Sequence, residues 1–412
     1  MTSSRCFLLG LSHPLPPSQL IHSDIQQPPV QTVKMRSFAV LSLLVSLAMA
    51  GPVEINKRAG EPVSAQITRV GNTGVKVTLT NTGTDSIKLF VPGTILDPAP
   101  VEKVTVISSN GKSILPRRGS ESTAKTRDLA ISVPFDGVRL RLAPPDLITG
   151  DSFKTIAPKE VLNLSFDFGQ MHDLTAGGNY DITAVSSIPY AKGGSTKIEG
   201  YIPIMSNTLS VKNVNGTQAG ITRRDFHLEA KRVAIQAGCT RQQNTMVNDA
   251  LIHCTNLATD AARAAMNNEK KMKEYFKTFS NDARRAVSLT MTKVANECRS
   301  RLATQSVSSL YCTDVYSSCK DGVLAYTVPS LKYMVNCPLY FNRLPSLTKT
   351  CHAQDQATTT LHEMTHLTQI RGTLDWGIYG YDAIKTLPSE KNLFHADTFC
   401  LFANSVNIGS KC

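Results

Sequence analysis

The sequence is short of cysteine over its first half. Cys6 is the only cysteine before Cys239, whereas nine cysteines lie from Cys239 to the end of the chain. The stretch from residue 51 to about residue 220 also has few histidines and no spacing suited to metal ligands, so we expect no catalytic role for it. After the N-terminal region no segment approaches the roughly 18 to 20 apolar residues of a membrane span, and we expect no membrane anchor.

A formal charge of +12 raises the question of nucleic-acid binding. The basic residues are scattered along the chain and no nucleic-acid-binding motif accompanies them, so a solvated surface explains them better. The length of 412 residues exceeds that of a usual single domain, and we expect more than one.

The N-terminal region has the composition of a leader. Residues 1–34 are rich in Pro, Ser and Gln without periodicity, which predicts disorder. Lys34 and Arg36 are followed by an apolar run over residues 38–49 and a small-residue site ending at Ala50, so residues 35–50 are predicted to be a secretory signal peptide. Because signals belong at the N-terminus, we expect translation to begin at Met35 and residues 1–34 to be a gene-model extension. A genuine long leader that begins at Met1 is the alternative.

Two kinds of periodicity follow one another along the chain. From residue 51 to about 220, apolar and polar residues alternate between turns rich in Gly, Asn and Asp, which predicts an antiparallel β-sandwich. The clearest alternating stretches are residues 63–70, 75–80, 86–91 and 180–185. Residues 244–277 and 281–302 carry apolar residues at helical spacing with few breakers, and predict two amphipathic helices.

The most informative stretch is Leu361-His362-Glu363-Met364-Thr365-His366-Leu367. Histidines four residues apart lie on one face of a helix, so both imidazoles can reach one ion, and Glu363 points into the same space. Residues 353–360, just before, contain no Pro or Gly and favour a helix. This pattern is typical of zinc peptidases, whose metal takes three protein ligands, so a third ligand is needed nearby.

Several residues compete for the place of the third ligand. Gln369 and Gly372 occupy the metzincin positions, which excludes that group. Glu390 is the candidate for a thermolysin-like ligand, but it sits beside a proline without supporting residues. Asp375 is better placed, because Gly372 can end the helix in a left-handed turn and return the chain over the metal.

This region resembles the deuterolysins, or aspzincins, a family of secreted fungal neutral zinc endopeptidases. The family pattern is His-Glu-x-x-His followed by Gly-Thr-x-Asp and Tyr-Gly. The matching residues are His362, Glu363, His366, Gly372, Thr373, Asp375, Tyr379 and Gly380. Three residues separate Asp375 from Tyr379, one more than is usual in the family. The likeness extends to residues 351–359 and 392–407, and so covers the C-terminal portion of the chain.

The resemblance implies a peptidase site. One zinc ion per catalytic domain is bound by His362, His366 and Asp375, and Glu363 is the general base that takes a proton from the attacking water. The fold class that we expect is therefore α+β, with a β-sandwich-like propeptide followed by a mainly α-helical, zincin-type catalytic domain stapled by disulfides.

Further roles follow from the same resemblance. Tyr379 is implied as the donor to the oxyanion, with Tyr340 as a second choice whose alternative role is core packing. Asp397 is implied either to orient the site or to line a pocket for the basic side chain after the cleaved bond, which favours basic protein substrates. We expect His395 to be an ordinary polar or core residue and Asp355 to cap the helix.

Basic pairs mark candidate processing sites. Arg223-Arg224 and Lys231-Arg232 lie in what we expect to be an exposed linker, and Lys57-Arg58 follows the signal peptide. Kexin-type secretory proteases cut after such pairs, and the resemblance implies a propeptide removed there. We expect a zymogen with a propeptide over residues 51–232 and a catalytic domain over residues 233–412. Cleavage after Arg224 and uncleaved surface charge are the alternatives to maturation after Arg232.

The cysteines of an exported protein favour disulfides over zinc-thiolate binding, since no two of them have the two-residue gap of a zinc knuckle. The resemblance implies three bridges: Cys239 to Cys312, Cys319 to Cys337, and Cys351 to Cys412. Cys254 and Cys298 lie on adjacent expected helices and are candidates to pair, which leaves Cys400 free and buried.

The function that we expect is a secreted, extracellular zinc metalloendopeptidase, monomeric, with protein and peptide substrates and a kexin-type protease as processing partner. A secreted non-catalytic binding or adhesion protein with a vestigial metal site is the alternative. Such a protein would have no reason to retain the base together with all ligand types. An adhesion module would also need the β-rich part to survive in the mature protein.

Overall fold

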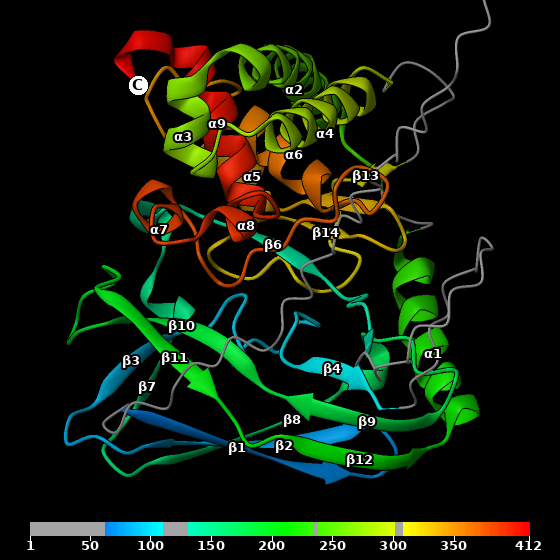
Figure 1. Ribbon diagram of the computed structural model, residues 1–412. Helices are drawn as coiled ribbons and strands as arrows, with labels where there is room; N and C mark the ends of the chain where they lie inside the picture. Colours follow the sequence, from blue (N-terminus) through cyan, green and yellow to red (C-terminus); the bar gives the residue numbers. More distant parts are fainter. Residues whose placement is uncertain (1–61, 110–130, 235–237, 301–307) are drawn as a thin grey trace, which may run out of the picture. The chain divides into compact units, whose positions relative to one another are not determined.

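The computed structural model describes residues 62–109, 131–234, 238–300 and 308–412 (Figure 1). All of these residues belong to one unit, Ile55–Cys412. The expected extension, the signal peptide and the pair Lys57-Arg58 lie outside the described residues. Within the described part, no helix combines the length and the apolar character that a membrane span requires.

Three antiparallel sheets form the β-rich part of the chain. Their strand orders are β1-β2-β8, β11-β10-β3-β7 and β12-β9-β4-β5. The strands are β1 (Val63–Val70), β2 (Gly74–Asn81), β3 (Ile87–Phe90), β4 (Thr105–Ser108), β5 (Ile131–Ser132), β7 (Phe153–Ile156), β8 (Val161–Asp167), β9 (Gly178–Thr183), β10 (Val185–Ala191), β11 (Gly200–Met205) and β12 (Leu209–Val214). The expected antiparallel strands are confirmed, whereas their assembly into a sandwich stays a prediction.

Alternation along the strands explains their core. Val63, Ala65 and Ile67 of β1 are buried because every second side chain points to the same face of the sheet. Val75 and Val77 of β2 are buried in the same cluster. The two strands pair antiparallel from end to end, so their apolar faces coincide.

A fourth sheet combines strands from distant parts of the chain. Its order is β13-β15-β14-β6. Three strands are close in sequence, β13 (Ser309–Tyr311), β14 (Val323–Val328) and β15 (Tyr333–Asn336), whereas β6 (Arg139–Leu142) comes from the β-rich part. β15 and β6 flank β14, and both run antiparallel to it. Figure 1 shows β6 beside β14.

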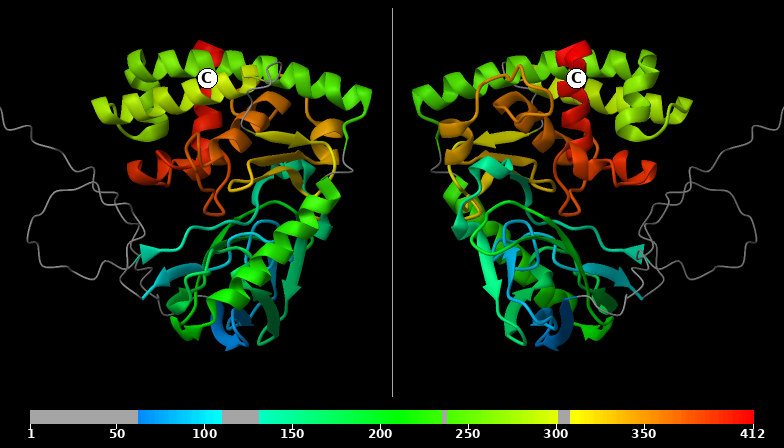
Figure 2. Two further views of the ribbon diagram at one scale, coloured as in Figure 1. Left: turned by 90° about the vertical axis from the view of Figure 1, so that its right-hand side faces the viewer. Right: turned by 90° about the vertical axis from the view of Figure 1, so that its left-hand side faces the viewer.

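Helices dominate the C-terminal part. They are α2 (Arg241–Asn267), α3 (Glu269–Phe276), α4 (Asn281–Arg299), α5 (Pro338–Arg343), α6 (Gln356–His366), α7 (Tyr381–Ile384), α8 (Ser389–Asn392) and α9 (Ala396–Ile408). The side chains of Thr240 and Ser280 cap α2 and α4. These two helices lie side by side (Figure 2) and bury a shared apolar cluster with α6 and α9. The expected mixture of a β-rich part and a helical part is confirmed.

Two expected helix boundaries were wrong. The stretch 244–277 is not one helix, because Asn268 stops α2 and its side chain accepts from the backbone of Lys271 to start α3. Asparagine favours such caps because its short side chain competes for backbone hydrogen bonds. The second helix, α4, ends at Arg299 rather than at residue 302, and residues 301–307 lie outside the described part.

The segment with both basic pairs is a helix, α1 (Gly216–Ala234), and the expectation of an exposed linker was wrong. Arg223 forms an ion pair with the buried Asp136, whereas Arg224 is exposed and pairs with Asp225. A protease that cut after either pair would need the segment extended, so α1 would first have to unwind locally.

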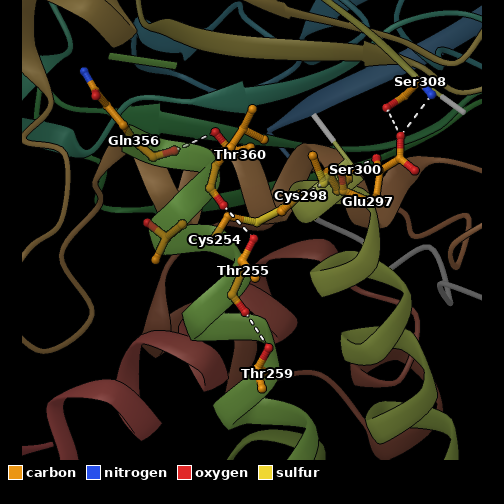
Figure 3. The surroundings of a disulfide bond; sticks show 12 residues. Cys254, Thr255, Thr259, Glu297, Cys298, Ser300, Ser308, Gln356 and Thr360 are labelled. Atoms are coloured by element: carbon orange, nitrogen blue, oxygen red, sulfur yellow. Dashed lines mark hydrogen bonds between the residues drawn. A yellow bond between two sulfur atoms is a disulfide. The ribbon is translucent and has the colours of Figure 1, made fainter. Parts of the chain in front are cut away.

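Four disulfides hold the helical part together. The three implied bridges are present, and Cys254 also pairs with Cys298. The last of these joins α2 to α4 across their interface, as Figure 3 shows. Cys400 is buried on α9 and outside these bridges, as the sequence predicted.

Candidate metal centre

Helix α6 carries the two histidines. Asp355 caps its N-terminus as expected. Its side chain accepts a 2.6 Å hydrogen bond from the backbone N–H of Thr358, and the Thr358 hydroxyl accepts one from the backbone N–H of Asp355. Every residue of the helix is buried, and His362 and His366 have no exposed surface. The expected end of the helix was wrong, since α6 stops at His366, before Gly372.

The chain after α6 turns back sharply. The backbone N–H groups of Ile370, Arg371 and Gly372 all donate to the carbonyl of Leu367, at 2.9 to 3.1 Å. Gly372 has a φ of +67°, so the left-handed turn lies at the expected residue although the helix has already ended.

A short bridge then fixes the returning chain to the helix. The backbone N–H of Thr373 donates to the carbonyl of Thr365 at 3.1 Å, and the two hydroxyls lie 2.8 Å apart. This bridge brings Asp375 over the two histidines.

The three expected ligands converge. His362 Nε2 lies 3.1 Å from His366 Nε2. Each of these nitrogens is 3.3 Å from an oxygen of Asp375. In a tetrahedral zinc site with ligand distances of about 2.0 to 2.1 Å, two ligand atoms lie about 3.3 Å apart. The spacing of the donor atoms therefore fits one zinc ion.

Burial gives a second reason to expect a cation. Burial, together with the nearby charges of Arg141 and His395, holds the pKa of His362 well below its ordinary value. Burial also lowers the pKa of His366 to about 3, so both imidazoles are neutral and able to bind a metal. Asp375 Oδ1 has no hydrogen-bond partner among the described residues. Burial of a carboxylate oxygen without a partner costs free energy, unless a bound cation compensates for that cost.

Neighbouring groups orient the two imidazoles. His366 Nδ1 donates to the carbonyl of Thr373 at 2.9 Å, which directs Nε2 toward Asp375. His362 Nδ1 lies 3.4 Å from Asp397 Oδ1, at the N-terminus of α9. Asp397 is thus placed to orient His362, one of the two roles that the resemblance implied.

His395 is a residue whose contribution the sequence did not indicate. It is fully buried, and its Nε2 lies 3.0 Å from the carbonyl of Asp375 and 2.9 Å from that of Ile378. It therefore ties down the backbone of the loop that carries Asp375. It contributes no side-chain atom to the three converging donors.

Glu363 lies between the histidines and faces β14. The hydroxyl of Thr327 on β14 donates to Glu363 Oε2 at 2.6 Å, and Glu363 Oε1 has no hydrogen-bond partner in the described part of the chain. Burial raises the pKa of Glu363 well above its ordinary value, although the bond from Thr327 opposes that shift. A carboxylate with one oxygen held and the other free is suited to exchanging a proton.

Tyr379 is better placed than Tyr340 for the implied role of donor to the oxyanion. Its hydroxyl donates to the carbonyl of Leu140 at 3.1 Å. Burial raises the pKa of Tyr379 well above its ordinary value, so the hydroxyl keeps its proton and can donate. The hydroxyl of Tyr340 instead meets Gln356 and Thr360 in the first part of α6, which agrees with a packing role.

Arg141 is the residue that the sequence analysis missed most clearly. It is 1% exposed on β6, forms an ion pair with Asp397, and brings Nη1 within 3.2 Å of His362 Nδ1. A basic residue inside an apolar alternating stretch was a possible signal, but periodicity does not say which distant residue pairs with it.

Other potential ligands lie elsewhere. Glu390, on α8, is exposed and is absent from every cluster of potential metal ligands in the described residues. His352 lies near Cys351 and Cys412, but those two thiols are joined in a disulfide and do not bind metal.

The geometry defines a class of protein. A buried helix presents two imidazoles and a carboxylate base, and an aspartate from the following loop completes three converging donors, as in metal-dependent hydrolases. Residues 32–412 match the family described as "Deuterolysin metalloprotease (M35) family".

Proteins of similar sequence agree with this match. A protein named neutral protease 2 homolog from Colletotrichum graminicola is 42% identical over 90% of this chain and 98% of its own length. One of the same name from Phaeosphaeria nodorum is 42% identical over 90% of this chain and 98% of its own length. The chain belongs to the deuterolysin metalloprotease family and is a metalloendopeptidase.

Among solved structures, a zinc peptidase from Grifola frondosa is similar to part of the chain. It is 19% identical, with a TM-score of 0.34, and the match covers 40% of this chain and 96% of that protein.

Proposed function

We propose that the chain is a secreted zinc endopeptidase, made as a zymogen, that binds one zinc ion through His362, His366 and Asp375. The convergence of these three donors at mutual distances of 3.1 to 3.3 Å is the observation that carries the proposal. When bound, zinc lowers the pKa of a bound water toward about 7 and polarises the peptide carbonyl.

Glu363 is the general base in this proposal. Its free oxygen, Oε1, takes a proton from the attacking water and delivers it to the leaving amine, while Thr327 holds Oε2. Burial raises the pKa of Glu363 above its ordinary value, which helps the carboxyl group to hold the proton that it takes from the water.

Tyr379 is the proposed donor to the oxyanion. Its hydroxyl keeps its proton because of burial, and it already donates to a peptide carbonyl, that of Leu140. Such a donor contributes most when the carbonyl oxygen gains negative charge.

Asp397 supports a preference for basic substrates. Its carboxylate is buried and holds the guanidinium of Arg141, so the same place suits a Lys or Arg side chain of a substrate. Asp397 also lies near His362, so in this proposal one carboxylate orients a ligand and also binds the substrate side chain.

The route to the mature enzyme is also a proposal. Residues 35–50 would direct secretion, and a kexin-type protease would cut after Arg224 or Arg232 to release residues 233–412. The exposed Arg224 and the disulfides of the C-terminal part support this route. Membership of a metalloprotease family disfavours the alternative of a non-catalytic binding or adhesion protein.

Substitution of the base tests the proposal. In the processed enzyme, Glu363→Gln should retain zinc, because the side chain is not one of the three donors. It should lower kcat by about 100- to 10,000-fold, the usual contribution of general-base catalysis. Glu390→Gln, which changes an exposed glutamate, is the matched control and should alter neither zinc content nor kcat. Substantial activity in Glu363→Gln would contradict the mechanism, and inactivity of the unsubstituted zinc-loaded enzyme would favour the binding protein.

A further inference from the structure

We propose that β6 is an internal substrate-like inhibitor: in the unprocessed chain Arg139–Leu142 lies where a peptide substrate binds, with Arg141 in the pocket of Asp397. The proposal rests on the endopeptidase function proposed above. It assigns β14 as the substrate-binding strand and the Leu140–Arg141 peptide as the bond in the cleavage position.

The first observation is the place of β6 in the fourth sheet. The other strands of that sheet belong to the C-terminal part, and β6 is added to the side of β14 that β15 leaves open. Ala325 pairs with Arg141, Tyr326 with Leu140 and Thr327 with Arg139. A peptide that adds an antiparallel strand to a sheet edge is a common mode of peptide recognition.

The second observation ties β14 to the catalytic groups. Thr327 of β14 donates to Glu363, so the strand runs directly beside the proposed base. A peptide on the open side of β14 lies within reach of the same groups. β6 takes this place (Figure 1) and contacts α6 as well as β14.

The third observation is the register. Tyr379 donates to the carbonyl of Leu140 at 3.1 Å, which is the contact that a scissile carbonyl would make with the proposed oxyanion donor. The next residue, Arg141, places its guanidinium against Asp397, and both side chains are 1% exposed. The carbonyl and the basic side chain thus flank one peptide bond, as the proposed preference for a basic residue after the cleaved bond requires.

Further contacts hold the strand at both ends. Gln354, which precedes α6, donates to the carbonyl of Leu142 at 3.2 Å. Arg139 pairs with Glu102 of the β-rich part at 2.5 Å. β6 is therefore fixed to the β-rich part and to the catalytic groups at once, and a substrate cannot bind along β14 until the strand leaves.

The position of β6 in the sequence determines what activation requires. Cleavage after Arg224 or Arg232 lies C-terminal to β6, so it breaks the chain without removing the strand from β14. Activity then requires a second event, the dissociation or degradation of the cut β-rich part.

The test uses the full zinc-loaded chain before processing, with two readouts. One is hydrogen exchange of the backbone amides of β14, and the other is hydrolysis of a quenched fluorescent peptide that contains a Leu-Arg bond. Arg141→Ala should speed exchange of Val323–Val328 on the order of 100-fold, because it breaks a buried ion pair. It should also raise hydrolysis by at least about tenfold. Arg141→Lys keeps a cation at this position, so its exchange and hydrolysis rates should lie between those of the unsubstituted chain and of Arg141→Ala.

Arg69→Ala is the matched control, since it removes an exposed arginine of β1 and should change neither readout. Unchanged exchange in the amides of α2 and α4 shows that Arg141→Ala is folded. The proposal that β6 inhibits the chain would be contradicted by either of two results. One is that the unsubstituted chain hydrolyses the peptide as fast as Arg141→Ala, and the other is that β14 exchanges equally fast in both chains. If β14 exchanges faster in Arg141→Ala but no zinc-loaded variant hydrolyses the peptide, the release of β6 would be supported and the proposed endopeptidase function would be contradicted.

Discussion

Thr327→Val isolates one contact of the proposed base. The hydroxyl of Thr327 donates to Glu363 Oε2 at 2.6 Å, and both side chains are buried. Valine keeps the shape of threonine and removes the donor. A hydrogen bond to a charged group contributes about 1.5 to 3 kcal/mol, which corresponds to a roughly 10- to 100-fold fall in kcat/KM.

The pH dependence identifies the cause. Thr327 lowers the pKa of Glu363 against the effect of burial, so its loss raises that pKa further. Because the base acts in its ionised form, the acid limb of the kcat/KM profile of the processed enzyme should move to higher pH. Thr359→Val is the matched control, since Thr359 is equally buried on α6 and its hydroxyl has no hydrogen-bond partner in the described residues. An acid limb that stays in place in Thr327→Val, or moves as far in Thr359→Val, would refute the role of Thr327 as a positioning residue.

Two further predictions concern stability. Replacing Cys351 and Cys412 together by serine opens a loop with a sequence separation of 61 and should lower the free energy of unfolding by about 4 kcal/mol, measured by denaturant titration; an unchanged midpoint would contradict the estimate. Burial lowers the pKa of His172 in the β-rich part, so the unfolded chain takes up a proton below pH ~6.5 before the folded chain does. Stability should therefore be retained above that pH and fall by up to about 1.4 kcal/mol per unit as the pH decreases, and His172→Gln should weaken this dependence in urea titrations at pH 5 and 7. An equal acid sensitivity in the variant would assign the effect to other groups.

The sequence was sufficient to predict the local parts of the candidate site. Two histidines at helical spacing depend on one helix, so His362 and His366 follow directly from their separation. The turn at Gly372 brought Asp375 within reach even though α6 ends earlier than expected, because the peptide groups after Leu367 continue to turn without forming a regular helix.

The long-range parts could not be predicted in the same way. Alternation predicted strands in the β-rich part, yet strand pairing depends on which distant edge is free, and periodicity carries no such information. The pairing of β6 with β14 and the ion pair of Arg141 with Asp397 are of this kind. For the same reason the sequence did not indicate that β6, from the β-rich part, contacts β14 and α6.

Zinc binding by the full chain tests the central claim most directly. The unsubstituted chain should bind one zinc ion. Asp375→Ala should weaken the zinc affinity by more than about 100-fold, which is more than the loss of a residue that only hydrogen-bonds a ligand would cause. Glu390→Ala, which removes the rejected candidate ligand, should bind zinc as tightly as the unsubstituted chain. Undiminished zinc affinity in Asp375→Ala would contradict the coordination by His362, His366 and Asp375.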